Sequence, residues 1–205
     1  MRIVFATGNK DKMREIRQIM GHFGMEIVSM KEAGVFEDIE ENGTSFKENS
    51  VIKASAIADV LIQKGDTDSI VLADDSGLEI DALSGEPGIY SARYMGKDTP
   101  YPEKNAKILE RLKDVPDDKR SARFVCAVSA VLPDKRVLTC QETMEGIIGH
   151  EIAGENGFGY DPIFFLPKFS KTSAQLTPEE KNSISHRGKA LRAMEELLSK
   201  ELAKD

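Results

Sequence analysis

The chain has 205 residues, which fits one domain or two closely packed lobes. Its 28 Lys and Arg against 35 Asp and Glu give a net charge of −7, which argues against a protein whose main partner is a nucleic-acid backbone. Apolar residues make up 40% and charged residues 31%, a globular rather than a disordered composition. No apolar run approaches the roughly 18 residues of a membrane span or the length of a secretory signal. We therefore expect a cytoplasmic protein with no membrane partner.

Strand and helix patterns alternate along the chain. Strands are predicted at 2–6, 26–30, 69–73, 123–132, 137–143 and 161–165. Helices are predicted after Asn9, over 46–64, from Pro102, after Thr177 and through Leu202. Because the 124–143 hairpin is antiparallel, this order predicts an α/β fold with a mixed sheet flanked by helices. No linker or repeat interrupts the pattern, so we expect a single catalytic domain over 1–205.

Cys126 and Cys140 lie in the two strands of that hairpin. A hairpin centred between Asp134 and Lys135 would place Cys140 opposite Ser129 and the two thiols on opposite faces. Both cysteines are therefore expected to be reduced.

The turn Thr7-Gly8-Asn9 joins the first strand to the first helix. Lys10, Lys12 and Arg14 crowd the start of that helix, where cations oppose the helix dipole. The same place is a natural anion site, because free N–H groups point outward from it. The pattern indicates phosphate binding, with a surface helix of unfavourable charge as the alternative.

The helix over 46–64 opens with Ser45 and Glu48, a capping-box pair. Lys53 lies beside the apolar stripe of this helix, and Asn49 lies at its edge one turn earlier. Lys53 is either aimed at an anion or lies along the apolar surface with its ammonium in water.

Asp74-Asp75-Ser76-Gly77 follows the strand at 69–73, and ligands of open α/β sheets bind at the carboxyl ends of strands. Neighbouring residues of an extended backbone point to opposite sides, so the two aspartates are expected to divide roles. One would face a ligand or metal and the other the scaffold. Carboxylates with Glu40 or Glu41 nearby suit Mg²⁺, which prefers oxygen ligands. A plain Asp-Ser-Gly turn is the alternative.

The last third of the chain combines aromatic and polar residues that could bind a flat base: Gly157-Phe158-Gly159-Tyr160-Asp161-Pro162, Lys181 and Ser185-His186-Arg187-Gly188. The alternative is that Phe158 and Tyr160 are core residues and that His186 caps a helix.

Six motifs, read in order, closely resemble the inosine triphosphate pyrophosphatase family over residues 3 to about 198. They are Thr7-Gly8-Asn9-x-x-Lys12, Ser45-Phe46-x-Glu48-Asn49-x-x-x-Lys53-Ala54, Ala73-Asp74-Asp75-Ser76-Gly77-Leu78, Pro87-Gly88-Ile89-Tyr90-Ser91-Ala92-Arg93-Tyr94, Gly157-Phe158-Gly159-Tyr160-Asp161-Pro162-Ile163-Phe164 and Ser185-His186-Arg187-Gly188-Lys189-Ala190-Leu191.

The resemblance implies an elongated α/β fold of two lobes with an active cleft between them, a homodimer and a requirement for Mg²⁺. It implies hydrolysis of ITP, dITP and XTP to the monophosphate and pyrophosphate. The implied phosphate contacts are Thr7, Gly8, Asn9, Lys10, Asp11 and Lys12, with Ser76 as a further substrate contact. The implied base contacts are Phe158, Gly159, Tyr160, Asp161, Lys181, His186 and Arg187.

In the implied mechanism Asp75 is the base and, with Glu41, a ligand of Mg²⁺. Lys53 faces the phosphates, and Asp74 helps to set metal or water geometry. Donors that meet the purine 6-carbonyl would exclude adenine. Three other functions are compatible with the sequence. The protein could be another Mg²⁺-dependent phosphohydrolase, a nucleotide-binding module without turnover or, least favoured by the charge, a nucleic-acid binder.

Overall fold

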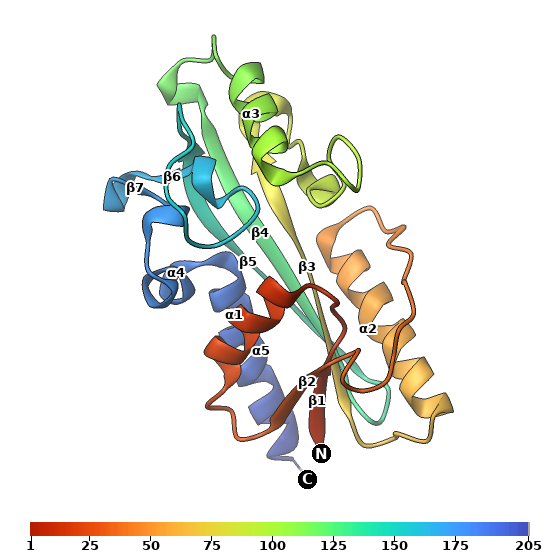
Figure 1. The fold of residues 1–205 in the computed structure, drawn as a ribbon. Helices are drawn as coiled ribbons and strands as arrows, with labels where there is room; N and C mark the ends of the chain where they lie inside the picture. The colour runs from red at the N-terminus through yellow and green to blue at the C-terminus, as the bar shows by residue number, and fades with distance from the viewer. Residues whose placement is uncertain (205) are drawn as a thin grey trace. The chain divides into compact units, whose positions relative to one another are not determined.

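The protein is described here by a computed structural model in which residues 1–204 are placed. These residues form a seven-stranded sheet in the order β2-β1-β3-β4-β5-β6-β7, with α-helices packed on it (Figure 1). The strands are β1 Arg2–Phe5, β2 Glu26–Ser29, β3 Ile70–Ile80, β4 Ser121–Val131, β5 Val137–Ile148, β6 Phe164–Leu166 and β7 Lys171–Thr172. The α-helices are α1 Lys10–Met20, α2 Phe46–Gln63, α3 Tyr101–Arg111, α4 Pro178–Ile184 and α5 His186–Leu202.

The predicted mixed α/β sheet is confirmed. β1 pairs in parallel with both β2 and β3, whereas β6 pairs antiparallel with β5 and β7. Across residues 1–204, no helix combines the length and the apolar character that crossing a membrane requires.

Internal contacts group the chain into two compact units. Unit 1 comprises 1–75, 126–142 and the chain from Arg187 onward, and unit 2 comprises 76–125 and 143–186. β3, β4 and β5 each give residues to both units, and the fourth passage lies at the start of α5, so the chain changes unit inside regular elements rather than through linkers.

The core of unit 1 lies on both faces of its part of the sheet. Ile3 and Phe5 of β1 belong to a cluster with apolar residues of α1 and α5, whereas Val4 belongs to a cluster with α2 (Figure 1). Because side chains alternate along a strand, an apolar run such as that of β1 fills both clusters.

Unit 2 has its own core, built from alternating residues of β3 and β4 together with α3. Leu78 and Ile80 of β3 share a buried cluster with Ile108 and Leu112, and Phe124 of β4 stacks at a tilt on Phe164 with ring centroids 4.5 Å apart. The core therefore fixes the far half of β3, which the sequence did not predict as a strand.

The structure corrects the expected end of that strand. Asp74-Asp75-Ser76-Gly77 lies in the middle of β3, which runs on to Ile80. The prediction treated Gly77 and the polar residues as a strand end, but the alternation of Leu78 and Ile80 continues into the core of unit 2.

Two smaller expectations are also corrected. Ser45 caps α2 by accepting the N–H of Glu48, but the Glu48 carboxylate bonds to Thr44 rather than back to Ser45. The expected strand at 161–165 begins only at Phe164, because Asp161–Ile163 forms a turn of 3₁₀ helix.

The hairpin of β4 and β5 has a register one residue away from the predicted one. The hydroxyls of Ser129 and Thr139 lie 3.1 Å apart, and Lys135 takes a left-handed conformation in the turn with φ of 68°. The shift brings Cys126 and Cys140 to the same core cluster, so the expectation of opposite faces is wrong. Both cysteines are free thiols, as predicted.

Candidate active site

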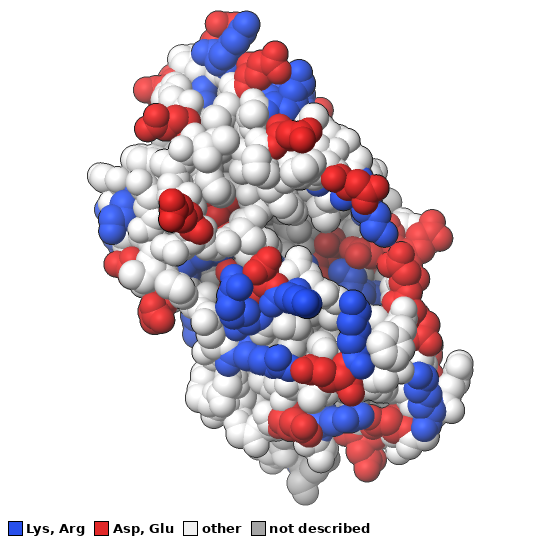
Figure 2. Space-filling view, viewed as in Figure 1, with Lys and Arg blue, Asp and Glu red and all other residues white. Residues whose placement is uncertain are grey.

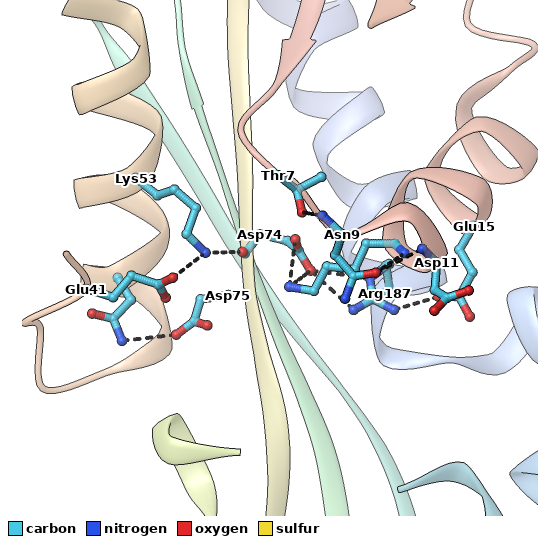
Figure 3. Close-up of polar contacts among 11 residues, drawn as sticks. Thr7, Asn9, Asp11, Glu15, Glu41, Lys53, Asp74, Asp75 and Arg187 are labelled. Atoms are coloured by element: carbon cyan, nitrogen blue, oxygen red, sulfur yellow. Dashed lines mark hydrogen bonds and ion pairs between the residues drawn. The ribbon is translucent and has the colours of Figure 1, made fainter. Parts of the chain in front are cut away.

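Asp74 and Asp75 point to opposite sides of β3, as the alternation of an extended strand requires (Figure 3). The Asp74 carboxylate faces α1 and the start of α5, whereas the Asp75 carboxylate faces α2. The predicted division of roles between the two aspartates therefore has a geometric basis within unit 1.

The Asp74 carboxylate is the centre of a buried charge network. Lys12 Nζ lies 3.0 Å from it, and Nε and Nη2 of Arg187 each lie 3.3 Å from its Oδ2. Arg187 also donates from Nη1 to Glu15 Oε2 at 2.5 Å. Burial alone would raise the pKa of Asp74, but the positive charges of Lys12, Arg187 and Lys53 hold it well below its usual value. Asp74 is therefore a fixed anion that orients two cations.

The Asp75 carboxylate has a different environment. Its Oδ2 accepts a hydrogen bond from Asn49 Nδ2 at 3.1 Å. Lys53 Nζ lies 3.0 Å from Glu41 Oε1 and donates to the Asp74 carbonyl oxygen at 3.1 Å. Burial raises the pKa of Asp75 to about 6; the charge of Lys53 opposes this rise and that of Glu41 adds to it. A carboxylate with a raised pKa is a stronger base than an ordinary aspartate.

The predicted phosphate-binding segment connects β1 to α1. Asn9 Oδ1 accepts the N–H groups of Asp11 and Lys12 at 2.9 and 3.1 Å, so it caps the helix. Thr7 Oγ1 accepts the Asn9 N–H at 3.1 Å and holds the turn. Any anion here would therefore meet side-chain cations and the remaining N–H groups of the turn, because the capped N–H groups are already satisfied.

Basic side chains gather around this turn, and Figure 2 shows Lys and Arg concentrated over the region of α1. A hollow of about 600 Å³ beside the turn is lined by four cations, Lys10, Arg14, Arg17 and Lys31. Arg14 pairs with Asp11 and Arg17 pairs with Glu32. Within residues 1–204, Lys10 and Lys31 form no ion pair with a carboxylate, so the hollow favours an anion.

Glu15 and Asn49 belong to these networks but were not predicted as site residues. Glu15 follows Lys12 by one turn of α1, and Asn49 precedes Lys53 by one turn of α2, so helical spacing could have indicated both. Gly43 packs on Asn49: a Cβ there would lie 2.7 Å from Asn49 Oδ1, which accepts the Gly43 N–H at 2.9 Å. That contact orients the Asn49 amide so that its Nδ2 meets Asp75.

The predicted base-binding segment lies in unit 2 and is held by a buried ion pair. Lys181 Nζ lies 2.7 Å from Asp161 Oδ2, and both side chains are buried. Asp161 Oδ2 also accepts the Phe158 N–H at 2.8 Å, and Lys181 Nζ lies 5.0 Å from the centre of the Phe158 ring. A Cβ on Gly157 would lie 2.3 Å from Asp161 Oδ2, so only glycine fits at this turn.

The remaining predicted base contacts have other neighbours in this structure. Tyr160 is buried, and the His186 ring stacks on Phe124 with centroids 4.8 Å apart. Arg187 belongs to unit 1 and bonds to Asp74 and Glu15 there. Ser76 follows Asp75 in β3 and is partly exposed.

The site offers few protein ligands for a metal. Among the residues described, His, Cys, Asp and Glu side chains nowhere form a group of three or more that could hold an ion. Glu41 and Asp75 are the pair of carboxylates near Lys53, and their mutual repulsion contributes to the raised pKa of Asp75.

Comparisons with known proteins match nearly the whole chain. The Ham1 family profile matches residues 3–197. A "dITP/XTP pyrophosphatase" of Clostridium perfringens is 46% identical over 197 residues, which are 96% of this chain and 97% of that protein. The "dITP/XTP pyrophosphatase" of Escherichia coli K12 is 47% identical over 195 residues, 94% of this chain and 95% of that protein.

A solved structure gives the same result for the fold. The Staphylococcus aureus Ham1 protein superposes with a TM-score of 0.85 at 40% sequence identity, covering 98% of this chain and 100% of that one. The family profile and the relatives agree over almost every residue, and this chain therefore belongs to the Ham1 family.

Proposed function

We propose that this protein is a nucleotide pyrophosphatase that hydrolyses non-standard purine nucleoside triphosphates, such as dITP, ITP and XTP, to the monophosphate and pyrophosphate. Relatives with 46% and 47% identity carry the name dITP/XTP pyrophosphatase. The observation that carries the proposal is the division of β3 at Asp74 and Asp75: one carboxylate orients cations, and the other has a pKa raised to about 6.

The triphosphate is assigned to unit 1. Lys12 and Lys53 approach β3 from opposite sides, and Lys10 lines the cationic hollow next to the turn at 7–9. Several fixed cations can hold a triphosphate and stabilise the charge that develops when one of its bonds breaks. Positioning and charge stabilisation supply most of the catalysis in such phosphoryl chemistry.

Asp75 is assigned as the general base. Its carboxylate removes a proton from a water molecule while the water oxygen attacks the α-phosphorus. The bond between the α-phosphorus and the bridging oxygen breaks, and pyrophosphate leaves with the electron pair of that bond. Asn49 holds the carboxylate in place through its 3.1 Å hydrogen bond.

A divalent cation, for which we propose Mg²⁺, fits the donor set of this site. Mg²⁺ is commonly held by one or two carboxylates together with substrate phosphates rather than by a full cage of side chains. Glu41 and Asp75 supply such a pair, and their repulsion would be relieved by a cation. When bound, the ion would neutralise charge on the phosphates; Lys53, now on Glu41, would then be released toward them.

The base is assigned to unit 2, where Phe158 offers a partly exposed ring. Hypoxanthine and xanthine carry a carbonyl at position 6, where adenine carries an amine. Donors placed for that carbonyl stay unpaired against adenine, and such a mismatch can discriminate by about 10⁴-fold. The candidates remain His186, Arg187 and backbone N–H groups near Phe158, although the Phe158 N–H is itself bonded to Asp161.

The test is a product assay with purified protein and Mg²⁺, offering ITP, XTP, ATP and GTP in parallel. Pyrophosphate from ITP and XTP, with ATP and GTP nearly inert, is the expected result. Orthophosphate would favour another Mg²⁺-dependent phosphohydrolase, and nucleotide binding without product would favour a binding module. Either result contradicts the proposal.

We also propose that the protein is a cytoplasmic homodimer that does not bind nucleic acid. The dimer rests on the family resemblance, the location on the lack of a long apolar run in the sequence, and the absence of nucleic-acid binding on the net charge of −7. Sedimentation equilibrium at micromolar concentration tests the dimer, since a single species with the mass of one chain contradicts it.

A further inference from the structure

The segment Pro87–Tyr94 forms one of the six sequence motifs, yet the proposed chemistry assigns it no task. In unit 2 its centre is Ser91, whose Oγ accepts the Leu78 N–H of β3 at 2.9 Å and donates to the Gly88 carbonyl at 2.6 Å. The segment is therefore tied to the strand that carries the catalytic aspartates, at a point beyond them.

Tyr160 connects this segment to the base-binding loop. Its hydroxyl donates to the Ser91 carbonyl at 2.8 Å, and its ring meets the Tyr101 ring edge-on, with centroids 5.2 Å apart and planes at 89°. The side chain is 3% exposed. A ring enclosed in this way holds the loop in place and leaves the partly exposed Phe158 ring as the surface on which a purine can stack.

The first half of α3 holds both segments. Asn105 Nδ2 donates to the Gly159 carbonyl at 3.1 Å, and Lys104 Nζ donates to the Ala92 carbonyl at 2.7 Å. The Tyr101 ring packs directly on Gly159, where a Cβ would lie 3.5 Å from Cε1. Three contacts from little more than one turn of α3 thus fix Gly159 and Ala92 to the same helix.

Lys104 and Asn105, which make these contacts, are polar residues at positions where packing alone would favour apolar ones. Asn105 is 2% exposed, and its Oδ1 has no hydrogen-bond partner in the described part of the chain. Lys104 is 1% exposed, and desolvation lowers the pKa of its ammonium. Burying polar groups with incomplete partners opposes folding, and apolar residues of similar size would fill the same space at lower cost. The hydrogen bond from Asn105 to Gly159 therefore indicates that Asn105 serves to hold the base-binding loop.

We infer that Asn105 is a positioning residue for purine recognition, because it fixes the Gly159 carbonyl and through it the angle of the Phe158 ring. The inference rests on the proposed function and deepens it: base selectivity depends on α3, which need not touch the substrate. The chemistry assigned to unit 1 is independent of this hydrogen bond.

The experiment compares wild type with Asn105→Ala, using Lys107→Ala on the same helix as a matched control. Lys107 is exposed and pairs with Glu110, so its loss leaves the contacts of α3 with Gly159 and Ala92 intact. KM and kcat are measured for ITP and ATP, together with inhibition by inorganic tripolyphosphate, which has no base. Loss of one buried hydrogen bond is expected to raise KM for ITP by up to about tenfold, with kcat within about twofold. The ITP-to-ATP ratio of kcat/KM should fall, and inhibition by tripolyphosphate should stay unchanged.

If Asn105→Ala has the same KM for ITP and the same ITP-to-ATP ratio of kcat/KM as wild type, the inference is wrong. So would equal losses for ITP and tripolyphosphate, because they indicate general damage to the enzyme. If Asn105→Ala does not fold, Asn105→Leu keeps the side-chain volume, removes the hydrogen bond to Gly159 and should give the same pattern. Wild-type protein that releases no pyrophosphate from ITP contradicts the proposed function itself, a failure visible before any variant is made.

Discussion

Asp74 and Asp75 are neighbours in one strand and are 1% and 8% exposed, yet the pKa values of their carboxyls shift in opposite directions. Asp74 is paired with Lys12 and Arg187, whereas Asp75 accepts a hydrogen bond from the Asn49 amide and feels the opposing charges of Lys53 and Glu41. Burial raises the pKa of both groups, so the neighbouring charges decide the outcome.

The comparison shows how one strand can supply a structural anion and a reactive one. An ionised carboxylate between two cations is held in its charged form and has little tendency to take a proton. The partner on the opposite face keeps a pKa near neutrality and can accept one. Substitutions on the two faces should therefore separate stability from activity.

The largest effect on stability is expected for Asp74→Asn. The change leaves the buried Arg187 and the partly buried Lys12 with one carboxylate fewer, and breaking a buried pair in this way costs about 3–5 kcal/mol. Chemical denaturation measures the free energy of unfolding, with Asp59→Asn as control because Asp59 is an exposed carboxylate 3.9 Å from Lys135. Equal stability of the two variants would remove the structural role of Asp74.

The largest effect on turnover is expected for Asp75→Asn. Loss of the general base should lower kcat by about 100-fold or more. The free energy of unfolding should be unchanged or higher at pH 7, because a raised pKa means that the fold disfavours the charged carboxylate. Steady-state kinetics and denaturation on the same preparation test both statements, and a folded variant with nearly full kcat would exclude Asp75 as the base.

Glu41→Gln should act on the metal requirement rather than on folding. If Glu41 and Asp75 share the cation, loss of one charged ligand should raise the Mg²⁺ concentration for half-maximal activity by about tenfold or more. Titration of activity with Mg²⁺ at saturating ITP measures the change. Glu40→Gln, in the same loop, is the matched control, and identical titrations for both variants would remove Glu41 from the metal site.

The smallest effect is expected for Glu32→Gln, which removes the exposed ion pair between Glu32 and Arg17. This pair is the exposed contrast to the buried pairs of Asp74. Hydrogen bonds from Arg17 and Ser29 lower the pKa of Glu32 to about 2. A lowered carboxyl pKa contributes stability above the ordinary value of 4.5, and the contribution is lost as the pH falls toward 2. Because both side chains are about half exposed, the loss at pH 7 should stay below about 1 kcal/mol. Denaturation at pH 7 and pH 2 measures the difference between the variant and wild type, which should be smaller at the lower pH.

Much of this arrangement follows from local sequence patterns. Strand alternation predicted that Asp74 and Asp75 point apart, and helical periodicity placed Lys53 and Asn49 on one side of α2. The order of strands and helices predicted the mixed sheet.

The parts that could not be predicted depend on contacts between distant segments. Glu15 joins the site through Arg187, 172 residues later in the chain, and no local pattern encodes that pair. The hairpin register depends on the left-handed Lys135, a residue type that seldom adopts that conformation. The sequence pattern predicts too early an end for β3 because the polar centre of this strand resembles a turn. In the structure one apolar cluster holds the residues before that centre and another holds the residues after it.

The most direct test of the central claim is hydrolysis of ITP in water labelled with oxygen-18, followed by mass spectrometry of both products. Attack at the α-phosphorus with pyrophosphate as the leaving group predicts one labelled oxygen in the nucleoside monophosphate and none in the pyrophosphate. Label in pyrophosphate, or in orthophosphate, would contradict the account and the role assigned to Asp75.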